Sequence, residues 1–156
     1  MKDRLSAYAD GRNHPDDDAA SGLSPWLHFG HISVHEVFQK LAEHESWNPD
    51  QLGDSRDTRG SRSGWWGMSE SAESFLDELV TWRELGFNMC WQCDNYDQYE
   101  SLPDWARKTL EQHAGDARPT IYSLDELTHG QTHDHLWNAA QNQLVQEGRM
   151  HNYLRM

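Results

Sequence analysis

The segment from Ser21 through Gly22 and Leu23 to Ser24 places hydroxyl groups and backbone amides where a helix is expected to begin. Ser24 followed by Pro25 is typical of an N-cap and the first helical residue, where the missing N–H of proline costs nothing. The free N–H groups of a helix N-terminus bind phosphate without a cluster of basic side chains. The segment therefore predicts either a phosphate-binding turn or ordinary helix capping.

A carboxylate and a large aromatic ring stand four residues apart in the segment 78–85. Glu78 and Trp82 are expected on one face of a helix, with Arg83 on the adjoining face. A carboxylate beside a ring can hydrogen-bond and stack a flat ligand that carries N–H groups. The alternative is a surface side-chain pair together with one buried tryptophan.

Histidines give a weaker pattern for metal binding. His28, His31 and His35 follow one another at intervals of three and four residues, which would align them along one helix. Gly30 and the expected N-cap Ser33 interrupt that helix, and no further ligand pair accompanies the three imidazoles. We therefore expect no metal site, and we interpret these histidines as surface or capping residues.

Cys90 and Cys93 form a CxxC motif, but it stands at the expected C-terminal end of a helix. A lowered thiolate pKa needs the N-terminal end of the helix dipole, so the position does not favour redox catalysis. A zinc ribbon would need a second pair of ligands at suitable spacing, which the sequence lacks. The glycine-rich and nucleophile motifs of common NTPases, dinucleotide-binding proteins and hydrolases are also missing.

The elements that must position these residues are expected to be helices, because helix-capping and helix-periodic patterns dominate the sequence. Ser33 and Glu36 form a capping box before an apolar stripe over residues 34–46. The strongest helix is expected over residues 72–91, with one face made of Phe75, Leu79, Trp82 and Gly86. Further helices are expected over residues 103–115, 123–130 and 132–148, because capping residues and terminal glycines mark their ends. The sequence thus predicts an all-α helical bundle.

Composition limits the classes of protein that remain. The chain has 156 residues with 13 Lys and Arg against 26 Asp and Glu, a formal net charge of −13. This length fits one domain, and 8 Trp, 5 Tyr and 4 Phe supply enough apolar area for a packed core. The negative charge argues against indiscriminate binding to nucleic acid. No apolar run reaches the roughly 20 residues of a membrane span, and the two cysteines favour a reducing, cytoplasmic location.

Several segments that together cover nearly the whole chain form a distinctive set. They are Tyr8 with Arg12-Asn13, and the runs 21–33, 75–85, 102–116, 122–141 and 148–156. In this order they resemble the flavin-binding helical domain of the DNA photolyase family. The runs DWARKTLEQH and THDHLWNAAQ are most similar to the class II cyclobutane pyrimidine dimer photolyases. The resemblance implies light-driven repair of pyrimidine dimers in DNA, by electron transfer from reduced FAD.

The resemblance also implies roles for individual residues. The pyrophosphate and ribityl part of FAD would be held by Tyr8, Ser21, Gly22, Leu23 and Ser24, with Arg83 beside the flavin. In the dimer pocket, Glu78 would hydrogen-bond the pyrimidine and stabilise the charge that develops on it. The other residues of that pocket would be Trp82, which stacks on the dimer, Asn152 and Met156. Contacts to DNA are expected from Trp82, Arg149, Asn152 and Arg155.

The resemblance further implies that residues 1–156 form only part of this FAD-binding domain. The α/β antenna-binding domain of the family is expected to be absent before Met1, and its C-terminal flavin-contacting helices after Met156. A domain cut through its packing exposes apolar surface, so self-association is expected. The expected partners are FAD and damaged DNA containing pyrimidine dimers, with no metal and no membrane.

Two alternatives keep the same fold. One is a cryptochrome-type flavin photoreceptor without repair activity, and the other is a degenerate helical scaffold that binds no cofactor. Glu78 and Trp82 favour repair over sensing, because a photoreceptor needs no carboxylate and ring to hold a dimer.

Overall fold

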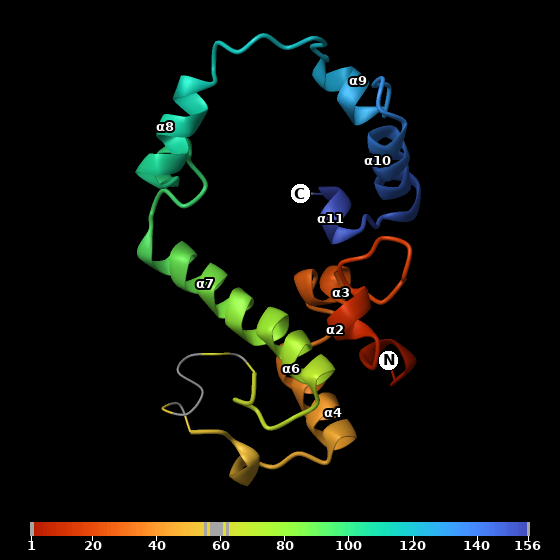
Figure 1. Ribbon diagram of the computed structural model, residues 1–156, viewed down its shortest axis with the longest axis vertical. Helices are drawn as coiled ribbons and strands as arrows, with labels where there is room; N and C mark the ends of the chain where they lie inside the picture. Colours follow the sequence, from red (N-terminus) through yellow and green to blue (C-terminus); the bar gives the residue numbers. More distant parts are fainter. Residues whose placement is uncertain (1, 55, 57–60, 62, 156) are drawn as a thin grey trace. The chain divides into compact units, whose positions relative to one another are not determined.

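The computed structural model describes residues 2–54, 56, 61 and 63–155, and the regular elements in this part of the chain are helical (Figure 1). No strand occurs among the described residues, which confirms the predicted all-α class. The α-helices are α1 (Lys2–Leu5), α2 (Tyr8–Gly11), α3 (Ser24–His28), α4 (Val34–Glu45), α6 (Glu70–Leu76), α7 (Arg83–Gln92), α8 (Asp104–Gln112), α9 (Leu124–Thr128), α10 (His135–Glu147) and α11 (Asn152–Arg155). Short 3₁₀ turns are η1 (Pro49–Gln51) and η3 (Tyr99–Ser101), and η2 (Asp77–Trp82) is a π-helical turn.

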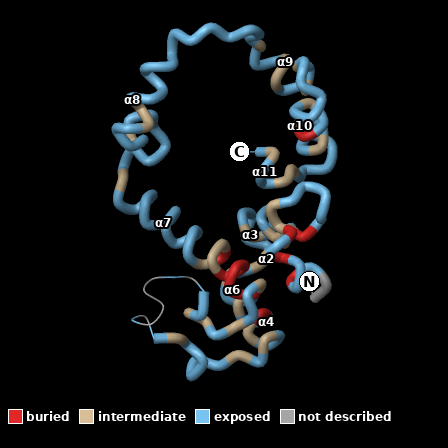
Figure 2. Tube along the Cα trace, in the orientation of Figure 1, coloured by how far each residue is buried: buried red, intermediate tan, exposed pale blue. Residues whose placement is uncertain are grey.

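The chain divides into two compact units, Met1–Glu84 and Leu85–Met156, and each is described by itself. The first unit holds the apolar core, which gathers around α2, α4 and α6 (Figure 2). Its buried residues are Leu5, Tyr8, Val37, Leu41, Ala72, Phe75, Leu76 and Leu79. The proposal of one domain over residues 1–156 stays a prediction.

Helix α4 begins where the sequence predicts. Ser33 adopts an extended conformation before the helix, and its hydroxyl accepts a hydrogen bond from the backbone N–H of Glu36 at 3.0 Å. This bond satisfies one of the donors that a helix start leaves unpaired. The apolar stripe then buries Val37 and Leu41, so α4 covers α6 with the face that the sequence pattern assigned.

The long helix expected over residues 72–91 is interrupted. Ser69 caps α6, the wide turn η2 follows, and α7 continues after it. A wide turn of this kind adds a residue to the helix and rotates the side chains that come after it. Phe75 and Leu79 are therefore buried, whereas Trp82 is 59% exposed and Gly86 is also exposed. The prediction that these four residues share one face was wrong for Trp82 and Gly86.

A buried carboxylate fixes the chain that leads into α6. Glu73 accepts hydrogen bonds from the backbone N–H groups of Gly64, Trp66 and Gly67 at 2.5, 3.0 and 2.9 Å. Its side chain lies in the core with only 6% of the residue exposed. Polar groups are tolerated at this depth because hydrogen bonds replace the water they lose. The contact thus ties residues 64–67 to the same helix that carries Phe75.

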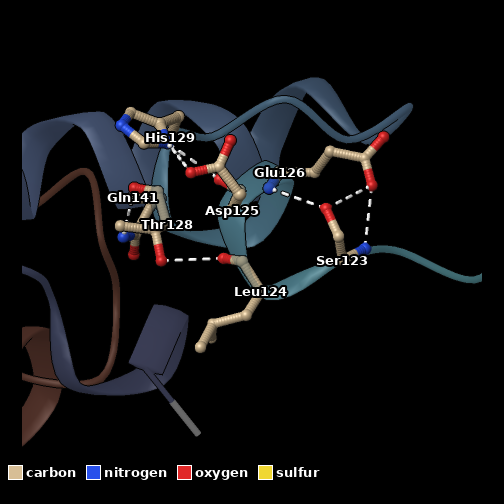
Figure 3. A network of polar contacts seen from close by, with 7 residues as sticks. All are labelled: Ser123, Leu124, Asp125, Glu126, Thr128, His129 and Gln141. Atoms are coloured by element: carbon tan, nitrogen blue, oxygen red, sulfur yellow. Dashed lines mark hydrogen bonds and ion pairs between the residues drawn. The ribbon is translucent and has the colours of Figure 1, made fainter.

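In the second unit, side-chain caps start α9 and α10, whereas α8 follows Pro103 without one. Ser123 and Glu126 form the predicted capping box at α9, shown with its neighbours in Figure 3. Thr132 was expected to begin the next helix, but Asp134 caps α10 because its carboxylate accepts the N–H groups of Leu136 and Trp137.

Two helices of this unit are followed by a glycine in the left-handed conformation, and the first is α9, which Gly130 follows with φ +62° near the predicted helix end. Gly148 ends α10 in the left-handed conformation, as predicted. Helix α8 ends at Gln112 with His113 as its C-cap, before the predicted end at Gly115, which does not adopt a left-handed conformation.

Large apolar side chains of the second unit remain exposed. The most open are Trp91, Ile121, Leu124 and Trp105, while Ala140 is buried. Exposed apolar surface of this kind agrees with the expectation drawn from the sequence, and self-association itself stays a prediction.

Candidate functional site

A pocket of about 220 Å³ opens in the first unit, between α1, α2, α6 and the chain before α3. Its lining residues are Arg4, Leu5, Tyr8, Ser21, Leu23 and Phe75. Apolar walls with a few convergent polar groups are typical of ligand sites, and a volume of this size suits one part of a larger ligand. The structure thus brings together Tyr8, Ser21 and Leu23, which the sequence assigns to cofactor binding.

The turn over residues 21–24 passes directly beside this pocket. Gly22 has φ +68°, a left-handed conformation that side chains with a Cβ rarely adopt. A Cβ added there would lie 3.8 Å from Nη1 of Arg4, so the backbone runs close to a cationic side chain. The N–H of Leu23 donates to Oγ of Ser21 at 3.4 Å, which fixes the turn locally.

Ser24 does not have the capping role predicted for it. It is the first residue of α3, and Leu23 occupies the N-cap position without a side-chain cap. Leu23 adopts a helical conformation, so the cap geometry that would aim the Ser24 hydroxyl at free N–H groups is not formed. Ser24 is exposed and is not among the pocket-lining residues.

Tyr8 forms the aromatic wall of the pocket. Its ring meets the ring of Phe75 edge to face, with centroids 5.4 Å apart and planes at 86°. The guanidinium carbon of Arg12 lies 5.5 Å from the centroid of the Tyr8 ring, within the range of a cation–π contact. Burial raises the pKa of Tyr8 above its ordinary value, and the neighbouring charge of Arg12 acts in the opposite direction. Tyr8 therefore stays a neutral hydroxyl at physiological pH.

Arg12 joins the Tyr8 wall to Glu78. The guanidinium and the carboxylate form an ion pair, with 18% and 36% of the two side chains exposed. Burial acts to lower the pKa of Arg12, but the hydrogen bond and charge of Glu78 outweigh it and raise that pKa. Arg12 therefore stays charged beside Glu78, whose carboxylate oxygens can also accept hydrogen bonds from a ligand.

Trp82 and Arg83 follow Glu78 in the sequence, but neither is among the residues that line the pocket. The indole of Trp82 is exposed at the end of η2, where it can stack on a flat ligand. Arg83 forms an exposed ion pair with Glu84 at 2.8 Å and is not among the residues that line the pocket. The structure thus groups Glu78 with Tyr8 through Arg12, and it does not bring Arg83 to the pocket.

The remaining predicted residues belong to the second unit. Asn152 accepts a hydrogen bond from Nη2 of Arg155 at 2.6 Å, so these two side chains lie together on α11. Arg149 donates through Nε to Glu147 at 2.8 Å. Met156 lies outside the described residues.

Metal binding finds no support in the part of the chain that the structure describes. No group of three or more His, Cys, Asp and Glu side chains there could hold an ion. His28 and His31 instead contact the ring of Phe29, and His31 also contacts Trp26. None of the described helices has the length and apolar character needed to cross a membrane.

The sequence did not assign a role to several residues of this site. Arg4, Leu5 and Phe75 line the pocket, and Arg12 holds Glu78. Tyr8 and Arg12 are four residues apart, a spacing that predicts contact within a helix and could have pointed to Arg12. Nothing in the pattern pointed to Arg4, because its place in the pocket depends on how α1 packs against residues distant in sequence.

Comparison with known proteins places the chain among named relatives. It is 44% identical over 156 residues to "Deoxyribodipyrimidine photo-lyase" of Potorous tridactylus, 26% of whose length it covers. The protein with the same name from Oryza sativa subsp. japonica is 38% identical over 154 residues, and the chain covers 26% of it. That of Methanothermobacter thermautotrophicus is 36% identical over 156 residues, with 29% covered. The chain thus spans about a quarter of the length of these relatives. No protein-family model matches it.

Proposed function

Because the chain belongs to the deoxyribodipyrimidine photo-lyase family, we propose that residues 1–156 form part of its FAD-binding helical domain. The activity proposed for the whole protein is the light-driven repair of cyclobutane pyrimidine dimers in DNA. When bound, FAD supplies the light-driven electron for this chemistry, and the chain supplies binding, orientation and electrostatics. The cytoplasmic location inferred from the sequence stays a prediction.

The pocket in the first unit carries the proposal. Tyr8 of α2 meets Ser21 and Leu23 of the turn before α3 at one cavity, together with Arg4 of α1. Arg4 has a guanidinium whose Nη2 donates to Asp18 at 2.6 Å and whose other N–H groups can bind phosphate oxygens, and Ser21 has a hydroxyl that can bind ribityl oxygens. Gly22 lets the backbone pass beside Arg4 without a Cβ. This set of donors fits the phosphate-bearing part of a dinucleotide, while Leu5 and Phe75 supply apolar walls.

Glu78 is proposed to recognise the lesion. The carboxylate of Glu78 can accept a hydrogen bond from the ring N–H of a pyrimidine, and it already accepts one from Arg12, with which it forms an ion pair. The guanidinium also offsets the negative charge of Glu78. A carboxylate alone would disfavour negative charge on the dimer, so the stabilisation assigned to Glu78 depends on Arg12 beside it.

Trp82, Asn152, Arg149 and Arg155 complete the proposed contacts with damaged DNA. The exposed indole of Trp82 would stack on the flipped dimer, a contact that does not require a particular base. Arg149 and Arg155 would neutralise phosphates and offset locally the net charge of −13. Asn152 and Met156 are proposed to line the dimer pocket.

The experiment that tests this proposal measures first whether the chain retains flavin and then whether it repairs a pyrimidine dimer. The purified chain is mixed with FAD, passed over a desalting column, and its visible flavin absorbance is recorded. The flavin is then reduced, and an oligonucleotide with one thymine dimer is added under blue light. Flavin that stays with the chain supports the proposed site, and loss of the dimer supports the proposed reaction.

The same experiment separates the two alternatives. Retained flavin without dimer loss favours a photoreceptor of the cryptochrome type. Failure to retain flavin, in a chain that is helical by circular dichroism, would contradict the proposal and leave a helical scaffold without cofactor.

A further inference from the structure

Helix α7 ends with two cysteines one helical turn apart. The N–H of Cys93 donates to the carbonyl of Met89 at 2.9 Å, so helical hydrogen bonding extends one residue beyond Gln92. Residues three apart in a helix lie on the same face, which brings Cys90 and Cys93 side by side. Both are free thiols, with Cys90 exposed and Cys93 partly buried. Neither cysteine is among the residues that line the pocket.

We propose that Cys90 and Cys93 are a thiol–disulfide modification site, closed by glutathione disulfide and reopened by glutathione. The Cα atoms of residues one turn apart are about 5 Å from each other, within the range that a disulfide spans. Their Cβ atoms in a regular helix are about 5–6 Å apart, more than the roughly 4 Å of a relaxed disulfide. Closure therefore requires the last turn to tighten.

The end of the helix is where such tightening is easiest. Cys93 lies just outside α7 and is followed by a turn over residues 94–97, so few helical hydrogen bonds depend on it. A disulfide that keeps some strain and is exposed to solvent is reduced more readily than a structural one. The site is therefore expected to respond to the glutathione ratio and not to remain permanently oxidised.

Exposure sets the order of the two thiols. The Cys90 thiolate attacks glutathione disulfide first, which forms a mixed disulfide and releases one glutathione thiolate. The Cys93 thiolate then attacks the Cys90 sulfur, forms the internal S–S bond and releases the second glutathione. Two cysteine thiols are oxidised and one glutathione disulfide is reduced to two thiols, while the cysteine protons pass through water to the glutathione thiolates.

The C-terminal location of the pair makes it a slow modification site and not a catalytic one. At this end of a helix the dipole does not stabilise a thiolate. Trp91 stands between the two cysteines and is 85% exposed. Because a disulfide quenches a neighbouring indole, this residue offers an optical signal of closure.

The test equilibrates the full chain in glutathione buffers with a rising share of the disulfide form, blocks free thiols with iodoacetamide, and measures intact mass. We expect a monomer that has lost two hydrogens, binds no iodoacetamide and carries no glutathione, and that returns to two blocked thiols after excess glutathione. Trp fluorescence should fall with closure, and Trp91→Phe should remove that change.

Cys90→Ser and Cys93→Ser are the matched controls, since each keeps one thiol on the same turn. Each is expected to carry one glutathione under the same oxidising buffer. Two glutathiones on the unaltered chain, disulfide-linked dimers in place of the internal bond, or thiols that stay reduced in excess glutathione disulfide would each overturn the proposal. None of these results depends on flavin binding, so the proposed function is tested separately.

Discussion

The guanidinium of Arg12, just after α2, and the carboxylate of Glu78, in the π-helical turn η2, form an ion pair between positions 66 residues apart. Arg12 also lies over the ring of Tyr8, which lines the pocket of the first unit. One side chain thus contacts both the proposed cofactor wall and the proposed lesion-binding carboxylate. The wide turn η2 matters here because Glu78 lies within it. Turns of this kind are frequent at functional sites.

Replacing Glu78 by Gln should weaken both the fold and repair. The change leaves the largely buried Arg12 without its carboxylate, which should cost about 1–2 kcal/mol in the free energy of unfolding. Flavin should remain bound while dimer repair falls. Urea denaturation and the repair assay measure the two effects, with Glu43→Gln, an exposed partner of Lys40, as the control. Unchanged repair would contradict the role given to Glu78.

Tyr8 should make stability fall at alkaline pH. Burial raises its pKa in the folded state, so its contribution is complete below the ordinary tyrosine pKa of about 10 and is lost as pH rises toward the folded pKa. Tyr8→Phe should therefore show a shallower loss of unfolding free energy between about pH 9 and 11. The exposed Tyr99→Phe should keep the slope of the unaltered chain. Equal slopes in all three proteins would exclude this role for Tyr8.

Arg4 should contribute to flavin affinity. Arg4→Gln removes the cation of the pocket, and the loss of one charge-assisted contact to phosphate should weaken FAD binding about tenfold. Riboflavin, which has no phosphate, should bind both proteins equally. Quenching of flavin fluorescence measures the affinities, and Arg56→Gln serves as the control, since Arg56 is exposed and is not among the pocket-lining residues. A similar loss with riboflavin would show that Arg4 does not act on phosphate.

Glu73 should stabilise the first unit more than any exposed carboxylate. Glu73→Gln replaces an acceptor oxygen by an amide that cannot accept, so at least one of the N–H groups of Gly64, Trp66 and Gly67 loses its partner. We expect a loss of about 2–3 kcal/mol in the free energy of unfolding by urea. Glu70→Gln, at an exposed position of the same helix, should change stability little. Equal effects of the two substitutions would contradict the interpretation of Glu73.

Local signals in the sequence determined the fold class and several helix ends. The hydroxyl of Ser33, the capping box of Ser123 with Glu126 and the left-handed Gly148 act within one turn of chain, so their types and spacing suffice to predict them. The joint order of motifs also identified the photolyase family, which the relatives confirm over the whole chain.

The tertiary structure decided the helical register around Trp82 and the contacts between site residues that are distant in sequence. A regular helix was expected through Trp82, because no residue type marks a π-helical turn. The structure has such a turn over Asp77–Trp82, and Trp82 is exposed. Ser24 follows the helical Leu23 and caps nothing, for reasons of backbone conformation that its neighbours in sequence do not reveal. The pairing of Arg12 with Glu78 and the place of Arg4 in the pocket join segments far apart in the chain. Such contacts depend on how helices pack, and spacing along the sequence does not encode packing.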